Sequence, residues 1–116
     1  KQIVINLAPA DIKKEGASFD LPIAIGILAS EGVISKEILK DYIITGELSL
    51  DGRLKPVKGA LSMAIATKEL FLKGIILPIS NASEAAVIQD ILVYGMESLH
   101  HVIEFLRGEK EIKPFC

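Results

Sequence analysis

A chain of 116 residues is the size of a single domain, and it can bury enough surface to fold without disulfides or metal staples. Half of its residues are hydrophobic, yet its longest apolar runs fall well short of the roughly 20 residues that cross a bilayer, which excludes a membrane span. The formal net charge of −2 comes without a cluster of lysine and arginine, which argues against a stand-alone nucleic-acid-binding protein.

Two features near the ends of the chain bear on its location and redox chemistry. The first residues contain neither the apolar region nor the small-residue cleavage site of a secretory signal, so we expect a cytoplasmic protein. The single cysteine, Cys116, has no second thiol with which to form a disulfide and no nearby histidine with which to bind a metal. We therefore assign it no role.

The first third of the chain predicts a strand followed by two helices. Residues 2–7 are rich in Ile and Val and predict a strand. Residues 20–30 place apolar side chains at helical spacing and predict a buried helix, with Ser18 or Asp20 available as its N-cap. Ser35 is expected to cap a second, short helix.

The middle of the chain predicts a hairpin. Residues 42–50 read as a strand, and the adjacent Ile43 and Ile44 indicate burial on both of its faces. Asp51-Gly52 is typical of a two-residue type I′ turn, which requires positive φ at both central residues. A second strand at residues 53–57 would complete the hairpin.

The remainder of the chain alternates helices with strands. We expect a helix at 59–71, a strand at 75–78, a helix that begins at Asn81 with Glu84 as capping partner, a strand at 91–94, and a last helix from Leu99 to Leu106 ended by Gly108. Strands that alternate with helices, together with one hairpin, predict an α+β domain, arranged as a two-layer α/β sandwich with a mixed sheet.

Three segments resemble a known family. They are NLAPAD at residues 6–11, FDLPIA at 19–24 and GELSLDGR at 46–53. They resemble the N-terminal, Lon protease-like domain of the magnesium-chelatase-like AAA+ proteins of the ComM/YifB type, and the resemblance covers nearly the whole chain. It implies the fold of the Lon proteolytic domain, which is shared with the second domain of small-subunit ribosomal protein five.

The resemblance also carries expectations about the rest of the protein. Residues 1–116 would be one Lon-like domain, a fragment of a larger AAA+ protein that lacks its N-terminal strands and its ATPase module. No phosphate-binding loop of the G-x-x-x-x-G-K-[ST] form occurs in this chain, so no cofactor is expected here, and ATP and Mg would belong to the missing ATPase module. The implied partners are that ATPase domain, further copies in a hexamer, and DNA through the full-length protein, with no membrane.

The same resemblance places a degenerate catalytic pair. In the Lon proteolytic domain a serine is activated by a lysine, and the aligned positions here are Ser18 and Leu61. Leucine cannot accept a proton, whereas a Ser-Lys hydrolase needs a lysine whose pKa burial has lowered toward neutrality. Lys58 lies three positions earlier, at the expected start of the helix, where it would not share the face of Leu61. We therefore expect no catalytic residues, and we interpret Ser18 as a helix-capping hydroxyl.

Other polar residues suggest weaker sites. The neighbouring His100 and His101 point about 100° apart on a helix and cannot jointly bind one metal. Asp20, Glu47 and Asp51 could form a carboxylate cluster, although a turn role explains Asp51 better. A small basic rim could contact nucleic acid or a partner; its members are Lys13, Lys14, Arg53, Lys55 and Lys58.

The sequence thus favours a non-catalytic accessory or assembly domain of a magnesium-chelatase-like AAA+ ATPase involved in DNA processing. Two alternatives remain open at this point. One is a Ser-Lys peptidase that uses Ser18, and the other is an independent nucleic-acid-binding module.

Overall fold

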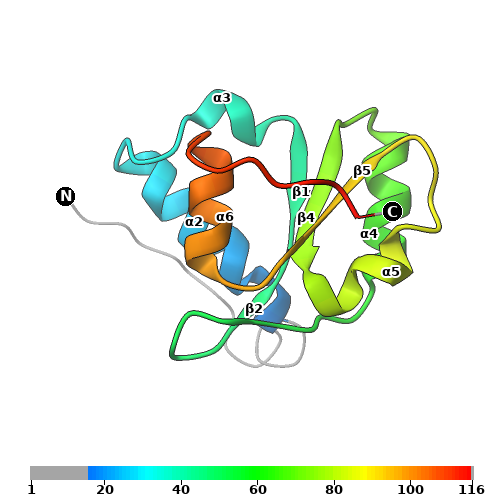
Figure 1. Ribbon diagram of the computed structural model, residues 1–116, viewed down its shortest axis with the longest axis horizontal. Coiled ribbons are helices and arrows are strands. Elements are labelled where there is room, and N and C mark those ends of the chain that lie inside the picture. Colours follow the sequence, from blue (N-terminus) through cyan, green and yellow to red (C-terminus); the bar gives the residue numbers. More distant parts are fainter. Residues whose placement is uncertain (1–15, 116) are drawn as a thin grey trace.

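The structure is a computed structural model that describes residues 16–115. The strand expected at residues 2–7 lies outside this range, as do Lys13, Lys14 and Cys116. The elements, in chain order, are η1 (Gly16–Phe19), α2 (Asp20–Ser30), α3 (Lys36–Leu39), β1 (Tyr42–Ile44), β2 (Glu47–Leu48), β3 (Leu54–Lys55), α4 (Ala60–Glu69), β4 (Gly74–Pro78), η2 (Ile79–Asn81), α5 (Ala82–Ala85), β5 (Leu92–Met96) and α6 (Leu99–Leu106) (Figure 1).

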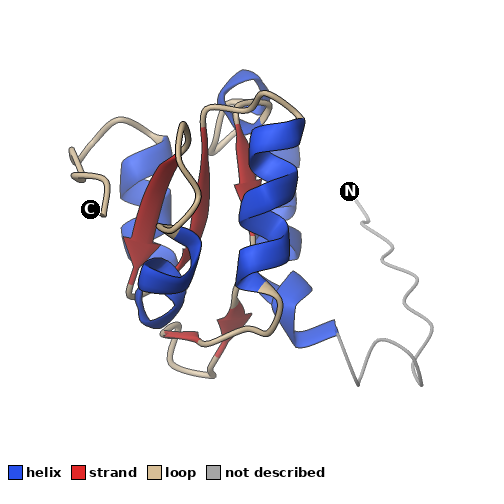
Figure 2. Ribbon diagram, turned by 90° about the vertical axis from the view of Figure 1, so that its right-hand side faces the viewer, coloured by secondary structure: helices blue, strands red, loops and turns tan. Residues whose placement is uncertain are grey.

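Three parallel strands form the central sheet, in the order β1-β4-β5 (Figure 2). Ile75 of β4 pairs with Ile43 on one side and with Val93 on the other. All five residues of β4 are buried, as is typical of a parallel strand that is covered on both faces. β2 and β3 form a separate antiparallel pair in which Glu47 lies opposite Lys55.

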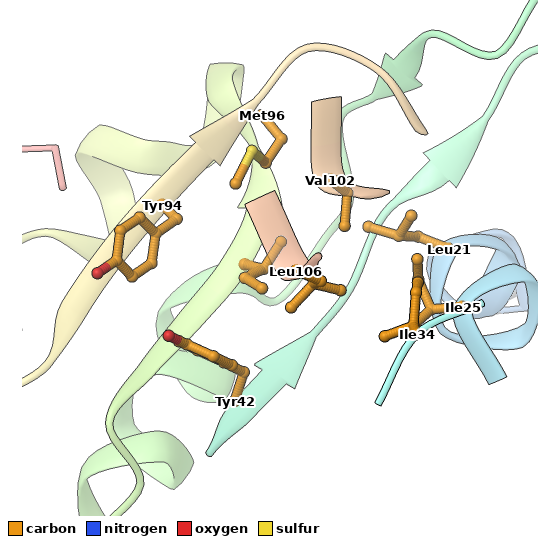
Figure 3. Close-up of a cluster of buried hydrophobic side chains, with 9 residues drawn as sticks. Leu21, Ile25, Ile34, Tyr42, Tyr94, Met96, Val102 and Leu106 are labelled. Carbon is orange, nitrogen blue, oxygen red and sulfur yellow. The ribbon is translucent and has the colours of Figure 1, made fainter. Parts of the chain in front are cut away.

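Helices cover both faces of the parallel sheet (Figure 1). On one face α2 and α6 pack over β1, β4 and β5, and their side chains converge on a core that includes Tyr42 and Tyr94 (Figure 3). On the other face α4 and α5 present alanines to Ile75, Leu77 and Val93. Alanine lacks a bulky side chain, so these helices approach the sheet closely.

The coarser expectation of an α+β domain with parallel and antiparallel pairing is confirmed, but the two-layer arrangement is wrong for the described residues. They form three layers, because successive residues of β4 point to opposite faces and all are apolar. Ile76 belongs to one core, whereas Ile75 and Leu77 belong to the other. A single layer of helices would leave one of these two apolar faces exposed to water.

The predicted strand at residues 42–50 is interrupted at Thr45 and Gly46, which belong to no strand and are both buried. Gly46 donates its N–H to the Ser18 carbonyl at 3.0 Å and accepts the N–H of Leu21 at 2.9 Å. A Cβ added at Gly46 would lie 3.2 Å from the Leu21 Cδ2 atom, so this close approach to α2 favours glycine. A tertiary contact therefore divides what the local pattern predicts as one strand.

The predicted two-residue turn at Asp51-Gly52 is also wrong. Ser49 donates its N–H to the Arg53 carbonyl at 2.9 Å, which leaves a loop of three residues between these two positions. Gly52 alone in this loop has positive φ, at 90°. A three-residue loop with glycine in the left-handed region is the next most common hairpin connection.

The helix termini are correctly predicted in part. Ser35 caps α3 by accepting the N–H of Glu37 at 3.2 Å, and Gly108 follows α6 with φ of 74°, as a helix-ending glycine does. In contrast, the N-cap position of α2 is occupied by Phe19, not by Ser18 or Asp20, and no side chain caps the helix there. Asn81 precedes α5 without a side-chain capping bond.

Across residues 16–115, no helix has both the length and the apolar character needed to cross a membrane.

Candidate functional site

The segments that carry Ser18 and Leu61 both lie at the end of the sheet where the parallel strands terminate. Thr45 follows β1, and its N–H bonds the Ile76 carbonyl at 3.0 Å, while the Ser18 carbonyl bonds the residue after Thr45. Leu61 is the second residue of α4, which starts at the same end and runs back toward the start of β4. Ligand sites of open parallel sheets form outside the carboxyl ends of the strands, so this end of the sheet is the candidate site.

Ser18 is half-buried in η1, and its backbone is part of a structural junction. Its carbonyl accepts the Gly46 N–H at 3.0 Å and the buried Thr45 hydroxyl at 3.2 Å. The interpretation of Ser18 as the N-cap of α2 is wrong, because Phe19 occupies that position without a side-chain bond. The described contacts of Ser18 therefore join η1 to the segment between β1 and β2.

Asp20 forms a second link at this junction. Its Oδ2 atom accepts the N–H of Leu48 at 3.0 Å, so the first residue of α2 binds the first strand of the hairpin. Asp20, Glu47 and Asp51 do not act as one carboxylate cluster, since Glu47 faces Lys55 and Asp51 bonds within its own turn. Among the described residues, no group of three His, Cys, Asp or Glu side chains is arranged to bind a metal ion.

Leu61 occupies the first turn of α4, with 39% of its surface exposed. Its N–H donates to the Glu84 Oε2 atom at 3.3 Å, so a carboxylate from α5 satisfies one of the free N–H groups at the start of α4. Lys58 is exposed and precedes Gly59, the N-cap residue of α4, which places it outside the helix as expected. Ser18 and Leu61 are thus held by separate networks, one with the β1–β2 segment and one with α5.

Asn81 has a structural role in this region that the sequence did not predict. It is 7% exposed, and its side-chain amide pairs with the backbone of Val57 at both ends: Oδ1 accepts the Val57 N–H at 2.9 Å, and Nδ2 donates to the Val57 carbonyl at 3.0 Å. Its position before a short helix suggested that it caps this helix, and no local feature of the sequence indicates that it hydrogen-bonds the backbone of a residue 24 positions earlier. Asn81 fixes the segment that leads from β3 into α4.

The basic rim is largely neutralised in the part of the chain that the structure describes. Arg53 lies 3.4 Å from the Asp51 carboxylate, and Lys55 lies 3.8 Å from that of Glu47. The Ser49 hydroxyl and then the Arg53 N–H hold the pKa of the Asp51 carboxyl below its usual value. The hairpin therefore presents paired charges instead of a cationic strip.

The two histidines make separate contacts. His100 Nε2 lies 3.3 Å from the Glu104 carboxylate, one helical turn later. His101 Nδ1 accepts the N–H of Glu97 at 3.4 Å. They share the rim of a polar pocket of about 220 Å³ but do not converge on one point.

The hairpin that carries GELSLDGR is anchored to the opposite end of the chain. Leu54 donates its N–H to the Glu97 carbonyl at 2.9 Å, and Leu99 donates to the Gly52 carbonyl at 2.8 Å. Fold and site together define a small α+β domain in which a serine segment, a tethered hairpin and the start of α4 meet at the carboxyl end of a parallel sheet.

Comparison with known proteins agrees with the family suggested by the sequence segments. The family described as "Subunit ChlI of Mg-chelatase" matches residues 1–81. Competence protein ComM of Haemophilus influenzae is 39% identical over 112 residues, which cover 97% of this chain and 22% of that protein. The protein YifB of Escherichia coli is 39% identical over 113 residues, with the same coverage. Lon protease 2 of Hydrogenovibrio crunogenus is 34% identical over 92 residues, which cover 79% of this chain and 10% of that protein.

The chain belongs to the magnesium-chelatase-like family that includes ComM and YifB, so the resemblance seen in the sequence is confirmed. It spans about a fifth of the length of these two relatives, at 22% of each.

Proposed function

We propose that this chain is a non-catalytic, Lon-like accessory or assembly domain of a magnesium-chelatase-like AAA+ ATPase that takes part in DNA processing. The observation that carries the proposal is Leu61 at the position where the Lon-type pair requires a lysine. ATP and Mg would bind in the ATPase module of the longer protein, and a cytoplasmic hexamer is its expected form. The similarity to ComM, a competence protein, supports the link to DNA.

The burial of polar side chains supports the absence of catalysis. A lysine serves as a general base only when burial or neighbouring charge lowers its pKa toward neutrality. The buried polar side chains among residues 16–115 are Thr45, Thr67 and Asn81, none of which can replace a lysine. Lys58, the nearest cation to Leu61 in the sequence, is exposed before the start of α4.

Labelling by a serine-directed phosphonate tests the proposal against the alternative of a Ser-Lys peptidase. We expect the 116-residue chain and its Ser18→Ala variant to show equal, background labelling by mass spectrometry. Leu61→Lys should stay unlabelled too, because position 61 is partly exposed and the Glu84 carboxylate would favour a charged lysine. Stoichiometric modification of Ser18 in the unaltered chain would overturn the non-catalytic assignment.

Deletion of this segment from the full-length protein tests the assembly role. We expect the ATPase that lacks residues 1–116 to form hexamers poorly in sedimentation velocity, while retaining nucleotide binding. A deletion variant that assembles as the intact protein does would contradict a role in assembly.

Charge pairing on the hairpin disfavours the second alternative, an independent nucleic-acid-binding module. Binding to phosphates through this rim would require Arg53 and Lys55 to leave Asp51 and Glu47. Fluorescence anisotropy with a labelled DNA duplex should therefore show no binding by the isolated chain at physiological salt. Salt-sensitive binding that is lost in Arg53→Ala would favour this module instead.

A further inference from the structure

The central parallel sheet ends at β5, the last strand in the order β1-β4-β5. Leu92 donates its N–H to the Lys73 carbonyl, on the side of β4. Because successive residues of a strand direct their backbone groups to opposite sides, those of Val93 and Gly95 point away from β4. Such a row of backbone groups at the edge of a sheet can pair with a strand of another chain.

The last described segment of the chain reaches this edge. After α6 the chain crosses the sheet to β5, where Phe115 donates its N–H to the Val93 carbonyl at 2.7 Å (Figure 1). Ile112 is half-buried and packs against the core that includes Tyr94. We call residues 111–115 the C-terminal strap. It is attached to the domain by an apolar contact with the core and by a backbone hydrogen bond with the edge of β5.

The residues between these two attachments are unsuited to pairing with a further strand. Lys113 and Pro114 are both exposed. Proline has no N–H to donate, and natural proteins place lysine and proline on edge strands, where they discourage pairing with other chains. The strap therefore occupies the edge of β5 without offering an equivalent edge of its own.

We propose that the C-terminal strap closes the β5 edge of the sheet and so prevents β5 from pairing with a strand of another copy of the chain. A strand that adds to β5 has to bond both Val93 and Gly95, and Phe115 already occupies the Val93 carbonyl.

The strap is the less stable of the two neighbours of β5. Within the described residues it is held by the Phe115 hydrogen bond and the half-buried Ile112 side chain, whereas β4 pairs with β5 along its full length. A segment with few buried contacts opens at a lower free energy than the core of the domain does. The strap can therefore leave the edge while the sheet stays folded, and substitutions that release it should expose β5.

Sedimentation velocity over about 10 μM to about 1 mM tests the proposal on the 116-residue chain. Phe115→Pro removes the N–H that bonds Val93, and Ile112→Asp removes the contact with the core. We expect the weight-average mass of each variant to rise with concentration, above that of the unaltered chain and toward that of two chains. Phe115→Leu is the matched control: it keeps the backbone N–H and an apolar side chain, so it should match the unaltered chain.

A second pair of variants tests the outer side of the strap. The double variant Lys113→Val/Pro114→Val restores a backbone N–H and introduces residues that favour strands, so it should also associate more strongly than the unaltered chain. Lys36→Val makes the same change from a charged to an apolar residue at an exposed position of α3, and it should leave the mass unchanged.

Far-UV circular dichroism shows which variants keep the fold. Folded Phe115→Pro that has the mass of the unaltered chain at every concentration would overturn the proposal, and so would Phe115→Leu that associates as strongly as Phe115→Pro. If Ile112→Asp unfolds, Phe115→Pro still decides, because Phe115 is 40% exposed and lies outside the buried core. None of these outcomes affects the proposed accessory role, which is tested by labelling and by deletion.

Discussion

Asn81→Ala should be the most destabilising substitution of a polar side chain in this region. The amide of Asn81 satisfies both the N–H and the carbonyl of Val57, at 2.9 and 3.0 Å. Alanine would leave both backbone groups without these partners, and each partly buried group without a partner costs about 1–3 kcal/mol. Because Val57 is half-buried, water would satisfy part of the loss, so we expect a total of about 2–3 kcal/mol.

Urea denaturation followed by far-UV circular dichroism measures this loss, since the chain has no tryptophan to report by fluorescence. The midpoint should fall while the slope with denaturant stays the same, because the same surface is exposed on unfolding. Ser80→Ala is the matched control: Ser80 is the exposed neighbour, and its loss should change the free energy of unfolding by less than about 0.5 kcal/mol. If Asn81→Ala behaved as Ser80→Ala does, the amide would not fix the entry to α4.

Two further predictions concern strain and ionisation. Phe71 has φ of 58° and is 94% exposed, so Phe71→Gly should raise the free energy of unfolding by about 0.5–1 kcal/mol in the same assay, because it relieves the strained backbone and removes little buried surface. Leu70→Gly, at φ of −87°, should instead lower the free energy of unfolding. A Phe71→Gly variant that is less stable than the unaltered chain would contradict the strain argument. Burial raises the pKa of both Tyr42 and Tyr94, so each tyrosine stabilises the fold below its unfolded pKa of about 10 and loses this contribution as the pH rises through its folded pKa. Because these are the two tyrosines of the chain, absorbance at about 295 nm should show tyrosinate forming above pH 10 together with loss of stability, and a normal titration in the folded state would refute the effect of burial.

The sequence predicted those elements whose signals are local. Residues 20–30 were expected as a helix and form α2 over the same bounds, because the apolar spacing is regular and Pro22 lies in the first turn, where its missing N–H is not needed. Ile43 and Ile44 indicated burial on both faces of a strand, which agrees with helices on both sides of the sheet. The error in the number of layers arose because the order of elements does not specify the face on which each helix packs.

The features that the sequence could not predict depend on contacts between distant segments. The break at Gly46 exists because α2 approaches it, and the role of Asn81 exists because Val57 lies beside it. The three-residue loop around Asp51 likewise depends on Ser49 and on the link from Gly52 to Leu99. In each case the local pattern was compatible with two structures, and tertiary hydrogen bonds favour the one that the pattern did not.

At the carboxyl end of the sheet, polar side chains hydrogen-bond to backbone groups of neighbouring segments. An active site usually holds titratable groups whose pKa values are shifted by burial or charge near the reacting atoms. The shifts at Tyr42 and Tyr94 instead arise in the apolar core beneath α6, and that at Asp51 arises in an exposed turn. Asp20 and Asn81, which lie in the same region as Ser18 and Leu61, bind backbone groups that join one segment to the next. These polar side chains hold neighbouring segments of the domain together, which agrees with the accessory role proposed above.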